Sequence, residues 1–305
     1  MNYNGIHCLV TGGAGFIGQH LVTALIERGA QVHVLDNFSY GAARSSIHPK
    51  AHIHEGDVTR YESFANLPQI EYSYVFHFAA PSSVMLFTKN PEQCIHETVA
   101  GFLNALKFCS QRSTKLIFPS SGSVYSGTNL PQQEHSPLNS DAMNAYARSK
   151  YALEHIQAAY GATVRSMALR IFAGYGPLED HKGDTASVVY AFCKKIANKK
   201  RPIIYGDGNQ ERDFIYITDL VHAILTLAEH HDERVINIGS GTRISFTELV
   251  SVINKVSGTN LQPIYVEKPH GYLEKTHADI SVLQRYYAQP MTPIAQGIEK
   301  VMKSF

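Results

Sequence analysis

Short apolar runs alternate with segments of helical periodicity through the first half of the chain. The runs that predict strands are 6–10, 32–36, 51–54, 74–78, 115–119 and 164–169. Apolar side chains recur every three or four positions near 16–29, 91–111 and 145–160, which predicts helices there. Alternation of this kind predicts right-handed crossovers, and hence an α/β fold with a doubly wound parallel sheet that is covered by helices on both faces.

The pattern is less regular after about residue 170, where glycine- and proline-containing segments predict loops. Helical periodicity returns at 187–198, 218–230 and 245–257, and the last of these helices begins with the capping-box spacing of Ser245 and Glu248. We expect one domain formed by residues 1–170, to which 213–239 return. Residues 171–212 and 240–305 would form a smaller C-terminal lobe that binds substrate.

A glycine-rich loop joins the first expected strand to the first expected helix. Gly13, Gly15 and Gly18 fit the G-x-G-x-x-G spacing, and Gly12, Gly15 and Gly18 fit its wider-spaced form. Glycine lets a ligand approach the backbone closely, and the N–H groups of a helix N-terminus favour an anion. The next strand ends in Asp36, about 20 residues further on, where dinucleotide-binding folds place a ribose-binding acid. These features predict a Rossmann-type domain, against the alternative of a turn that merely packs helix on strand.

Bulk composition narrows the class of protein. The chain has 305 residues, of which 44% are hydrophobic and 17% charged, as in an ordinary globular enzyme. A net charge of +1 gives no field that would attract nucleic acid, and no apolar run is long enough to cross a membrane. The N-terminus lacks the pattern of a signal peptide, so we expect none. The four cysteines are far apart and form no C-x-x-C, so we interpret them as buried thiols in a reducing compartment and not as a disulfide set or metal site. We therefore expect a cytoplasmic protein with no metal, nucleic-acid or membrane partner.

Tyr146 and Lys150 are four residues apart on an expected helix and so share one face. A free phenol has a pKa of about 10, but a nearby ammonium group and an oxidised nicotinamide lower it. Such a tyrosine can take a proton from a sugar hydroxyl while hydride leaves the same carbon. Tyr190 and Lys194 repeat the spacing, and we interpret that second copy as chance.

Ser121 follows the fifth expected strand, next to Ser120. Ligands of open α/β sheets bind beyond the carboxyl ends of the strands, so Ser121 can hydrogen-bond the reacting oxygen. The plain alternative is that small polar residues suit a turn at the end of a strand.

Taken in order, these motifs resemble the extended short-chain dehydrogenase/reductase family, specifically its NAD-dependent nucleotide-sugar epimerase and dehydratase branch. The resemblance covers nearly the whole chain. The matching segments are the loop 11–18, Asp36, Asp57 with Val58, the segment 77–80, Ser121 with Tyr125, Tyr146 with Lys150, and the segments 169–177 and 206–214.

The resemblance implies a retained NAD, with NADP possible, a nucleoside-diphosphate sugar as substrate, and a homodimer formed through helices such as 91–111 and 145–160. Asp36 favours NAD because it would repel a 2′-phosphate, although Arg44 could soften that rejection. The implied cofactor-binding residues are Gly12, Gly15, Phe16, Ile17, Gly18, Asp36, Asn37, Asp57, Val58, Phe78, Ala79, Ala80, Tyr146 and Lys150. The implied substrate-binding residues are Ser83, Ser121, Ser123, Val188 and Arg212.

Arg212 should contact the substrate diphosphate, since a guanidinium pairs well with phosphate oxygens. The alternative is a structural arginine that pairs with Asp213 or Asp219. The segment 176–183 resembles ADP-glycero-manno-heptose 6-epimerases, in which the lysine that matches Lys182 is a second catalytic acid/base. The alternatives for Lys182 are a solvated loop lysine or a phosphate contact.

Departures from the family pattern bear on the reaction. Gly122 and Ser123 stand where dehydratases and decarboxylases carry catalytic acids, which argues against a dehydratase. Ala173 and Thr98 replace two usual asparagines, and the stretch 271–275 lacks the family's common arginine and carries Glu274. The diphosphate contacts could therefore be weaker or different.

The leading hypothesis is a nucleotide-sugar epimerase that oxidises a sugar hydroxyl transiently and returns the hydride, with Tyr146 as acid/base, Lys150 tuning it and Ser121 orienting the hydroxyl. The alternatives are a keto-sugar-nucleotide reductase or dehydrogenase and, less favoured, a dehydratase or a dinucleotide-binding protein without catalysis. The base, the sugar and the inverted carbon stay open.

Overall fold

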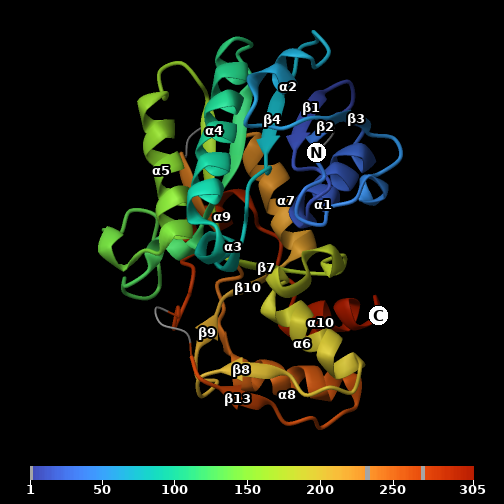
Figure 1. Cartoon of the computed structure of the whole chain (residues 1–305), viewed down its shortest axis with the longest axis vertical. Coiled ribbons are helices and arrows are strands. Elements are labelled where there is room, and N and C mark those ends of the chain that lie inside the picture. The colour runs from blue at the N-terminus through green and yellow to red at the C-terminus, as the bar shows by residue number, and fades with distance from the viewer. Residues whose placement is uncertain (1–2, 231–233, 269–271) are drawn as a thin grey trace.

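A seven-stranded parallel sheet forms the centre of the molecule (Figure 1). The computed structural model describes residues 3–230, 234–268 and 272–305. The strand order is β11-β6-β5-β4-β1-β2-β3, and every neighbouring pair runs parallel. The strands are β1 (His7–Thr11), β2 (Gln31–Asp36), β3 (His52–Glu55), β4 (Tyr74–His77), β5 (Lys115–Ser121), β6 (Ser166–Ile171) and β11 (Val235–Ile238). The predicted doubly wound α/β fold is confirmed.

Alternate side chains of each strand point to opposite faces of the sheet, so both faces of the sheet are apolar. Helices cover and bury both of these faces. Val10 of β1 belongs to a core cluster that includes α1 (Phe16–Glu27) and α7 (Ile217–Ala228). Its neighbour Leu9 belongs to a second cluster on the other side, with α2 (Tyr61–Ala65), α4 (Pro91–Ser110) and α5 (Ala145–Ala159). The two clusters fix α1 and α5 on opposite sides of the carboxyl ends of β1 and β5.

The smaller lobe lies beyond the carboxyl ends of the strands, at the bottom of Figure 1. Its elements surround a part of the same apolar core that continues from α7. They are β7 (Ala173–Tyr175), α6 (Val188–Ala197), β8 (Ile203–Tyr205), β9 (Glu211–Arg212), β10 (Phe214–Tyr216), β12 (Ile244–Ser245), α8 (Phe246–Ser257), β13 (Ile264–Val266) and α10 (Ile294–Met302). The C-terminal helix α9 (Ser281–Tyr286) instead packs against β11 and α7 of the main part. The predicted capping box of Ser245 and Glu248 begins α8. A short helix not expected from the sequence, α3 (Val84–Lys89), borders the cleft between the two parts.

One strand begins later than its pattern predicts. The run 164–169 corresponds to β6, which starts at Ser166, because the N–H of Val164 still bonds the Tyr160 carbonyl in the turn that ends α5. Residues 235–238 form β11 beside β6, so this later segment completes the main sheet. The full division into two domains stays a prediction.

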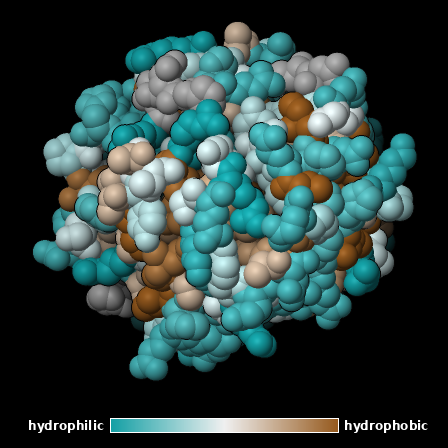
Figure 2. All heavy atoms as spheres, turned by 90° about the horizontal axis from the view of Figure 1, so that it is seen from above, coloured by the Kyte–Doolittle hydropathy of each residue, from teal (hydrophilic) through white to brown (hydrophobic). Residues whose placement is uncertain are grey.

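The surface at the end of the sheet away from the smaller lobe is mostly hydrophilic. Figure 2 shows apolar side chains there in small, scattered groups. Within the described ranges, the helices are all too short or too polar to cross a membrane.

Candidate active site

A cleft of about 490 Å³ opens where the carboxyl ends of the parallel strands face the smaller lobe. The glycine loop, the ends of β2, β3, β4 and β5, the start of α5 and three segments of the smaller lobe line it. The predicted site residues found on its wall are Gly12, Gly15, Phe16, Ile17, Gly18, Asp36, Asn37, Asp57, Val58, Phe78, Ala79, Ala80, Ser121, Ser123, Tyr146, Lys150, Lys182, Val188 and Arg212. The structure thus brings the residues predicted to bind cofactor and those predicted to bind substrate together in one cleft.

Ser83 is the predicted site residue that the structure places differently. It caps the N-terminus of α3, where its hydroxyl accepts a hydrogen bond from the N–H of Met85 at 3.2 Å. Its neighbour Ser82 lines the cleft instead. The side chain at the cap position is turned toward the helix backbone, and the residue before it faces the ligand space.

The glycines of the loop carry no side chains, so a dinucleotide can approach the loop backbone closely and fit the cleft. Gly12 has a φ of +71°, and a Cβ there would lie 2.6 Å from the backbone nitrogen of Ala79. A Cβ on Gly18 would lie 2.0 Å from the Gly12 carbonyl oxygen. Asp36 accepts hydrogen bonds from the N–H groups of Ala14 at 2.9 Å and Phe38 at 2.8 Å. These bonds hold the carboxylate where the ribose of a dinucleotide would bind.

Tyr146 and Lys150 lie on the cleft side of α5, whose first turn is capped by the side chain of Asn144. Burial raises the pKa of Tyr146, and a hydrogen bond with Ser121 opposes that rise. Burial lowers the pKa of Lys150 to about 8. The Lys150 ammonium lies 6.0 Å from the centre of the Tyr146 ring. Burial thus raises the pKa of the Tyr146 phenol and lowers that of the Lys150 amine, because desolvation disfavours the charged form of both groups.

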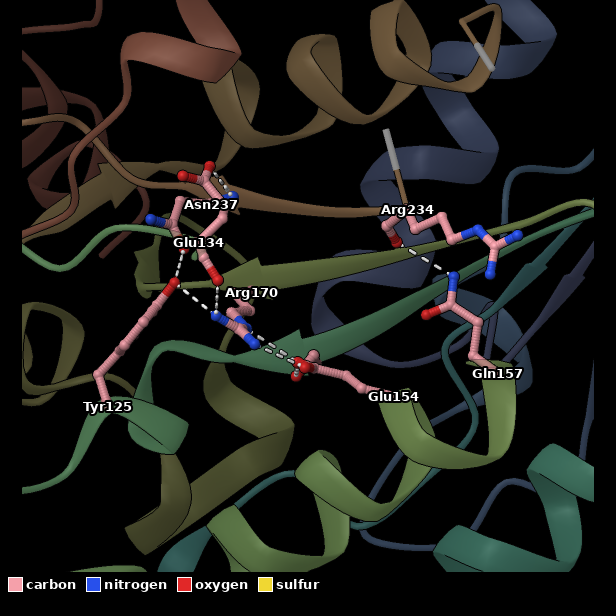
Figure 3. A network of polar contacts seen from close by, with 8 residues as sticks. Tyr125, Glu134, Glu154, Gln157, Arg170, Arg234 and Asn237 are labelled. Atoms are coloured by element: carbon pink, nitrogen blue, oxygen red, sulfur yellow. Dashed lines mark hydrogen bonds and ion pairs between the residues drawn. The ribbon is translucent and has the colours of Figure 1, made fainter. Parts of the chain in front are cut away.

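A buried polar network connects α5, which carries Tyr146 and Lys150, with β5 and β6 (Figure 3). Arg170 of β6 forms a bidentate ion pair with Glu154 of α5, with contacts of 3.0 and 2.7 Å. The hydroxyl of Ser120, at the end of β5, donates to the same carboxylate at 2.5 Å. Arg170 also donates to the Tyr125 hydroxyl at 2.7 Å, and that hydroxyl donates to Asn237 at 2.8 Å. Since Glu154 is four residues after Lys150, the network fixes Tyr146 and Lys150 relative to Ser121.

Arg212 points into the cleft from β9, on the side of the smaller lobe. Its guanidinium donates to the backbone carbonyls of Glu211, Leu273 and Glu274. The proposed partner Asp213 instead accepts hydrogen bonds from residues of the 240–241 turn, and Asp219 accepts them from Thr292. Neutral backbone carbonyls, and not a carboxylate, thus hold the Arg212 guanidinium at the wall of the cleft.

Lys182 also faces the cleft, and its side chain is only 18% exposed. Its ammonium donates to Glu179 at 2.8 Å and lies 4.9 Å from the centre of the Phe16 ring. Glu179 is fully buried and also accepts hydrogen bonds from the N–H and hydroxyl of Ser187. Lys182 is therefore a fixed cation beside the glycine loop and not a solvated loop lysine.

The sequence model of the NAD dependent epimerase/dehydratase family matches residues 8–239. The chain belongs to the NAD-dependent epimerase/dehydratase family. A putative UDP-glucose 4-epimerase of Methanocaldococcus jannaschii is 33% identical over 299 residues, which cover 96% of each chain.

Solved structures of family members share the whole architecture. The UDP-glucose 4-epimerase of Thermotoga maritima with UDP-glucose has a TM-score of 0.91 and 28% identity, with 98% of each chain covered. The UDP-glucose 4-epimerase of Thermus thermophilus in complex with NAD has a TM-score of 0.89 and 27% identity over 98% of each chain. The predicted family, the Rossmann-type fold, NAD as cofactor and the assignment as an NAD-dependent epimerase are confirmed.

Departures from the family pattern have local explanations in the structure. Thr98 is buried within α4, where its hydroxyl donates to the Cys94 carbonyl at 2.7 Å and so turns away from the cleft. Ala173 lines the cleft and offers it only a methyl group. The Glu274 carboxylate forms an ion pair with Lys268, and this ammonium group compensates its negative charge. Gly271, also part of this stretch, lies outside the described residues.

Several cleft residues were not predicted from the sequence. Tyr40 reaches the cleft from the loop after β2, Glu97 from α4, and Thr276 from the C-terminal part of the chain. Thr276 accepts a hydrogen bond from the N–H of Asp213, 63 residues earlier. Tyr40 lies four residues after Asp36, which is predicted to bind the ribose. This short distance along the sequence is the signal that could have identified Tyr40 as a cleft residue.

Proposed function

We propose that the chain is a nucleotide-sugar epimerase that inverts one carbon of the sugar of a nucleoside diphosphate. The observation that carries this proposal is the pairing of Tyr146 with Ser121 at the cofactor cleft, with Gly122 and Ser123 where a carboxylic acid would be needed for dehydration. The relatives named as UDP-glucose 4-epimerases support a UDP-sugar as substrate and C4 as the inverted carbon.

Tyr146 acts as the acid/base of this reaction. NAD, when bound, supplies the hydride acceptor for the first half-reaction and the hydride donor for the second. As a phenolate, Tyr146 takes the proton of the sugar hydroxyl, and its phenol later returns a proton to the carbonyl oxygen of the oxidised sugar. Ser121 holds that oxygen in line, and Lys150 stabilises the phenolate electrostatically. The glycine loop and Asp36 hold the dinucleotide.

Inversion requires the oxidised sugar to present its opposite face to the cofactor. The wall of the cleft carries apolar side chains from both parts of the molecule, including Val84, Leu86, Phe172 and Val188. Apolar walls make few directional contacts, so they permit a sugar to turn while Arg212 holds the diphosphate. In this scheme one tyrosine serves both faces in succession.

Lys182 supports a variant of this proposal, in which it is the second acid/base. It lines the same cleft as Tyr146 and is held by Glu179. Replacement by methionine separates the two schemes. A loss of about 100-fold or more in kcat identifies Lys182 as a proton donor or acceptor, whereas a rise in KM with kcat retained identifies a phosphate contact.

The deciding experiment uses the purified NAD-loaded protein and a panel of nucleoside-diphosphate sugars, with no reduced cofactor added. An epimerase converts each pure substrate epimer to a mixture with no net formation or consumption of NADH. The competing reductase would form product only when NADH is supplied in equal amount. Product formation that requires stoichiometric NADH would overturn the proposal.

We also propose a homodimer formed through α4 and α5. Ile95 and Leu103 of α4 are 41% and 39% exposed and lie two turns apart on its outer side. Sedimentation equilibrium on the wild type and on Leu103→Glu tests the assembly. A wild-type monomer at micromolar concentration would exclude it.

A further inference from the structure

A short loop crosses the cleft directly after β2. We call residues 38–41 the strap. At one end, the Tyr40 hydroxyl donates a hydrogen bond to Glu97 of α4 at 2.6 Å. The other carboxylate oxygen of Glu97 accepts from Gln93, one helical turn away, at 2.8 Å. The strap is thus fastened to a carboxylate that α4 itself holds in place.

The other end of the strap meets the segment that carries Lys182. Gly41 has a φ of +79°, and a Cβ there would lie 2.4 Å from the carbonyl oxygen of His181. Only glycine lets the two backbones approach this closely. The strap therefore spans from α4, in the dinucleotide-binding part, to the segment 180–185 beside the substrate side.

The strap lies over the end of the cleft where the adenosine of a dinucleotide would bind. Tyr40, Glu97 and His181 line the same cleft as Asp36. Glu97 is four residues before Gly101 on α4, and a Cβ on Gly101 would lie 2.8 Å from the side chain of Val58, at the predicted adenine edge. The Tyr40–Glu97 hydrogen bond thus lies one helical turn of α4 from the predicted adenine site.

The backbone of the strap adopts an unfavourable conformation. Phe38 and Tyr40 are not glycines, yet their φ values are +55° and +56°. Such conformations persist only where surrounding contacts impose them, and they cluster at ligand clamps and switch regions. Here the side chain of Asp36 accepts from the N–H of Phe38, and that of Asn37 accepts from the N–H of Ser39. The ribose-binding acid and the strap are therefore one connected unit.

We propose that the strap retains the dinucleotide, and that the Tyr40–Glu97 hydrogen bond must open before the cofactor can leave. This inference rests on the proposed function. An epimerase returns its hydride to the substrate in every cycle, so it gains from holding one cofactor molecule through many turnovers. A reductase must exchange its cofactor at each turnover and would be slowed by such a strap.

The test measures the release of NAD from the loaded protein after dilution, by an enzymatic assay of free NAD over time. Tyr40→Phe keeps the ring and removes the hydroxyl, and we expect release to become roughly tenfold faster, as for the loss of a hydrogen bond to a charged group. Glu97→Ala should have a similar effect. The double variant should release NAD no faster than the faster single variant, because both substitutions break the same bond.

Tyr61→Phe is the matched control. The Tyr61 hydroxyl donates to the side chain of Gln111 at 2.5 Å, and Gln111 is the C-cap of α4, at the end of the helix away from the cleft. Its release rate should equal that of the wild type. Glu97→Gln keeps an acceptor oxygen without the charge, and it should give an intermediate rate even if Glu97→Ala folds poorly.

The outcomes separate the strap from the function on which it rests. Unchanged release from NAD-loaded Tyr40→Phe, or effects of the two single variants that multiply in the double variant, would overturn the strap and leave the epimerase proposal standing. A wild-type protein that releases NAD as fast as Tyr40→Phe would likewise overturn the strap, whereas product formation that requires stoichiometric NADH would overturn the proposed function itself. Faster release from Tyr40→Phe with normal release from Tyr61→Phe would support the strap.

Discussion

Two helices, α5 and α6, carry a tyrosine and a lysine at the same spacing, yet their surroundings differ. On α5, Tyr146 faces Ser121 in the cleft and Lys150 is only 3% exposed. On α6, Tyr190 is buried in the smaller lobe against the ring of Phe305. Lys194 reaches the surface and pairs with Asp180 at 2.5 Å, and the two side chains are 50% and 64% exposed.

The difference arises from the neighbours of each helix and not from the helices themselves. Both begin with a polar cap, Asn144 in α5 and Ser187 in α6. α5 lies against the carboxyl end of β5, where a parallel sheet binds ligands, whereas α6 packs against α8 and α10. A four-residue spacing thus becomes a site only where the fold places it at the edge of a sheet and buries its lysine.

The largest effect in this comparison should come from removing the two hydroxyls. Tyr146→Phe should lower kcat by roughly 1,000-fold or more, because it removes the acid/base and general acid–base catalysis contributes about 10²–10⁴-fold. Tyr190→Phe should leave the steady-state constants within about twofold. A Tyr146→Phe enzyme with normal turnover would remove the basis for treating the helices differently.

The two lysines should differ in how they affect stability. The pKa of Lys150 falls from 10.5 to about 8 on folding, so in the cofactor-free protein below pH 8 the charged amine destabilises the folded state by about 3 kcal/mol. Between about pH 8 and 10.5 the unfolded chain binds more protons, and wild-type stability rises with pH. Lys150→Met should therefore be more stable than the wild type at pH 7, and this advantage should vanish as the pH passes through that window.

Urea unfolding of the cofactor-free proteins at pH 7 and pH 10 measures this difference. The same Lys150→Met variant should lose about 100-fold in kcat, so that activity and stability move in opposite directions. Equal stability of variant and wild type at pH 7 would show that water reaches the Lys150 ammonium.

The contrast between the two helices also shows which parts of the site can be predicted from a local sequence motif and which depend on the folded chain. Gly12 and Asp36 could be found because their roles depend on local strand–turn–helix geometry, which a short motif encodes. The sequence predicted Ser83 as a site residue, but Ser82 lines the cleft. The N-cap of α3, a helix that the sequence did not predict, determines which of the two serines faces the cleft. Thr276 reaches the cleft only through contacts made by the folded chain. The raised pKa of Tyr146 depends in the same way on burial by distant segments.

Ser121 should have a smaller effect, and chiefly on the pH dependence. Its hydrogen bond lowers the pKa of Tyr146 against the effect of burial, so Ser121→Ala should leave a phenol that ionises at higher pH. The acidic limb of the kcat profile should then move to higher pH, with a loss of about tenfold in kcat at neutral pH. An unshifted limb with the same loss would indicate that Ser121 orients the substrate only.

The smallest effect should follow from Lys194→Met on α6. The Asp180–Lys194 pair is exposed, and surface ion pairs contribute about 0–1 kcal/mol to stability because water screens the charges and both side chains lose freedom. The free energy of unfolding should therefore change by less than about 1 kcal/mol, with no difference between pH 7 and pH 10 like that of Lys150→Met. A large loss of stability would mean that Asp180, which also bonds the buried Tyr190, depends on Lys194 to hold that side of α6 in place.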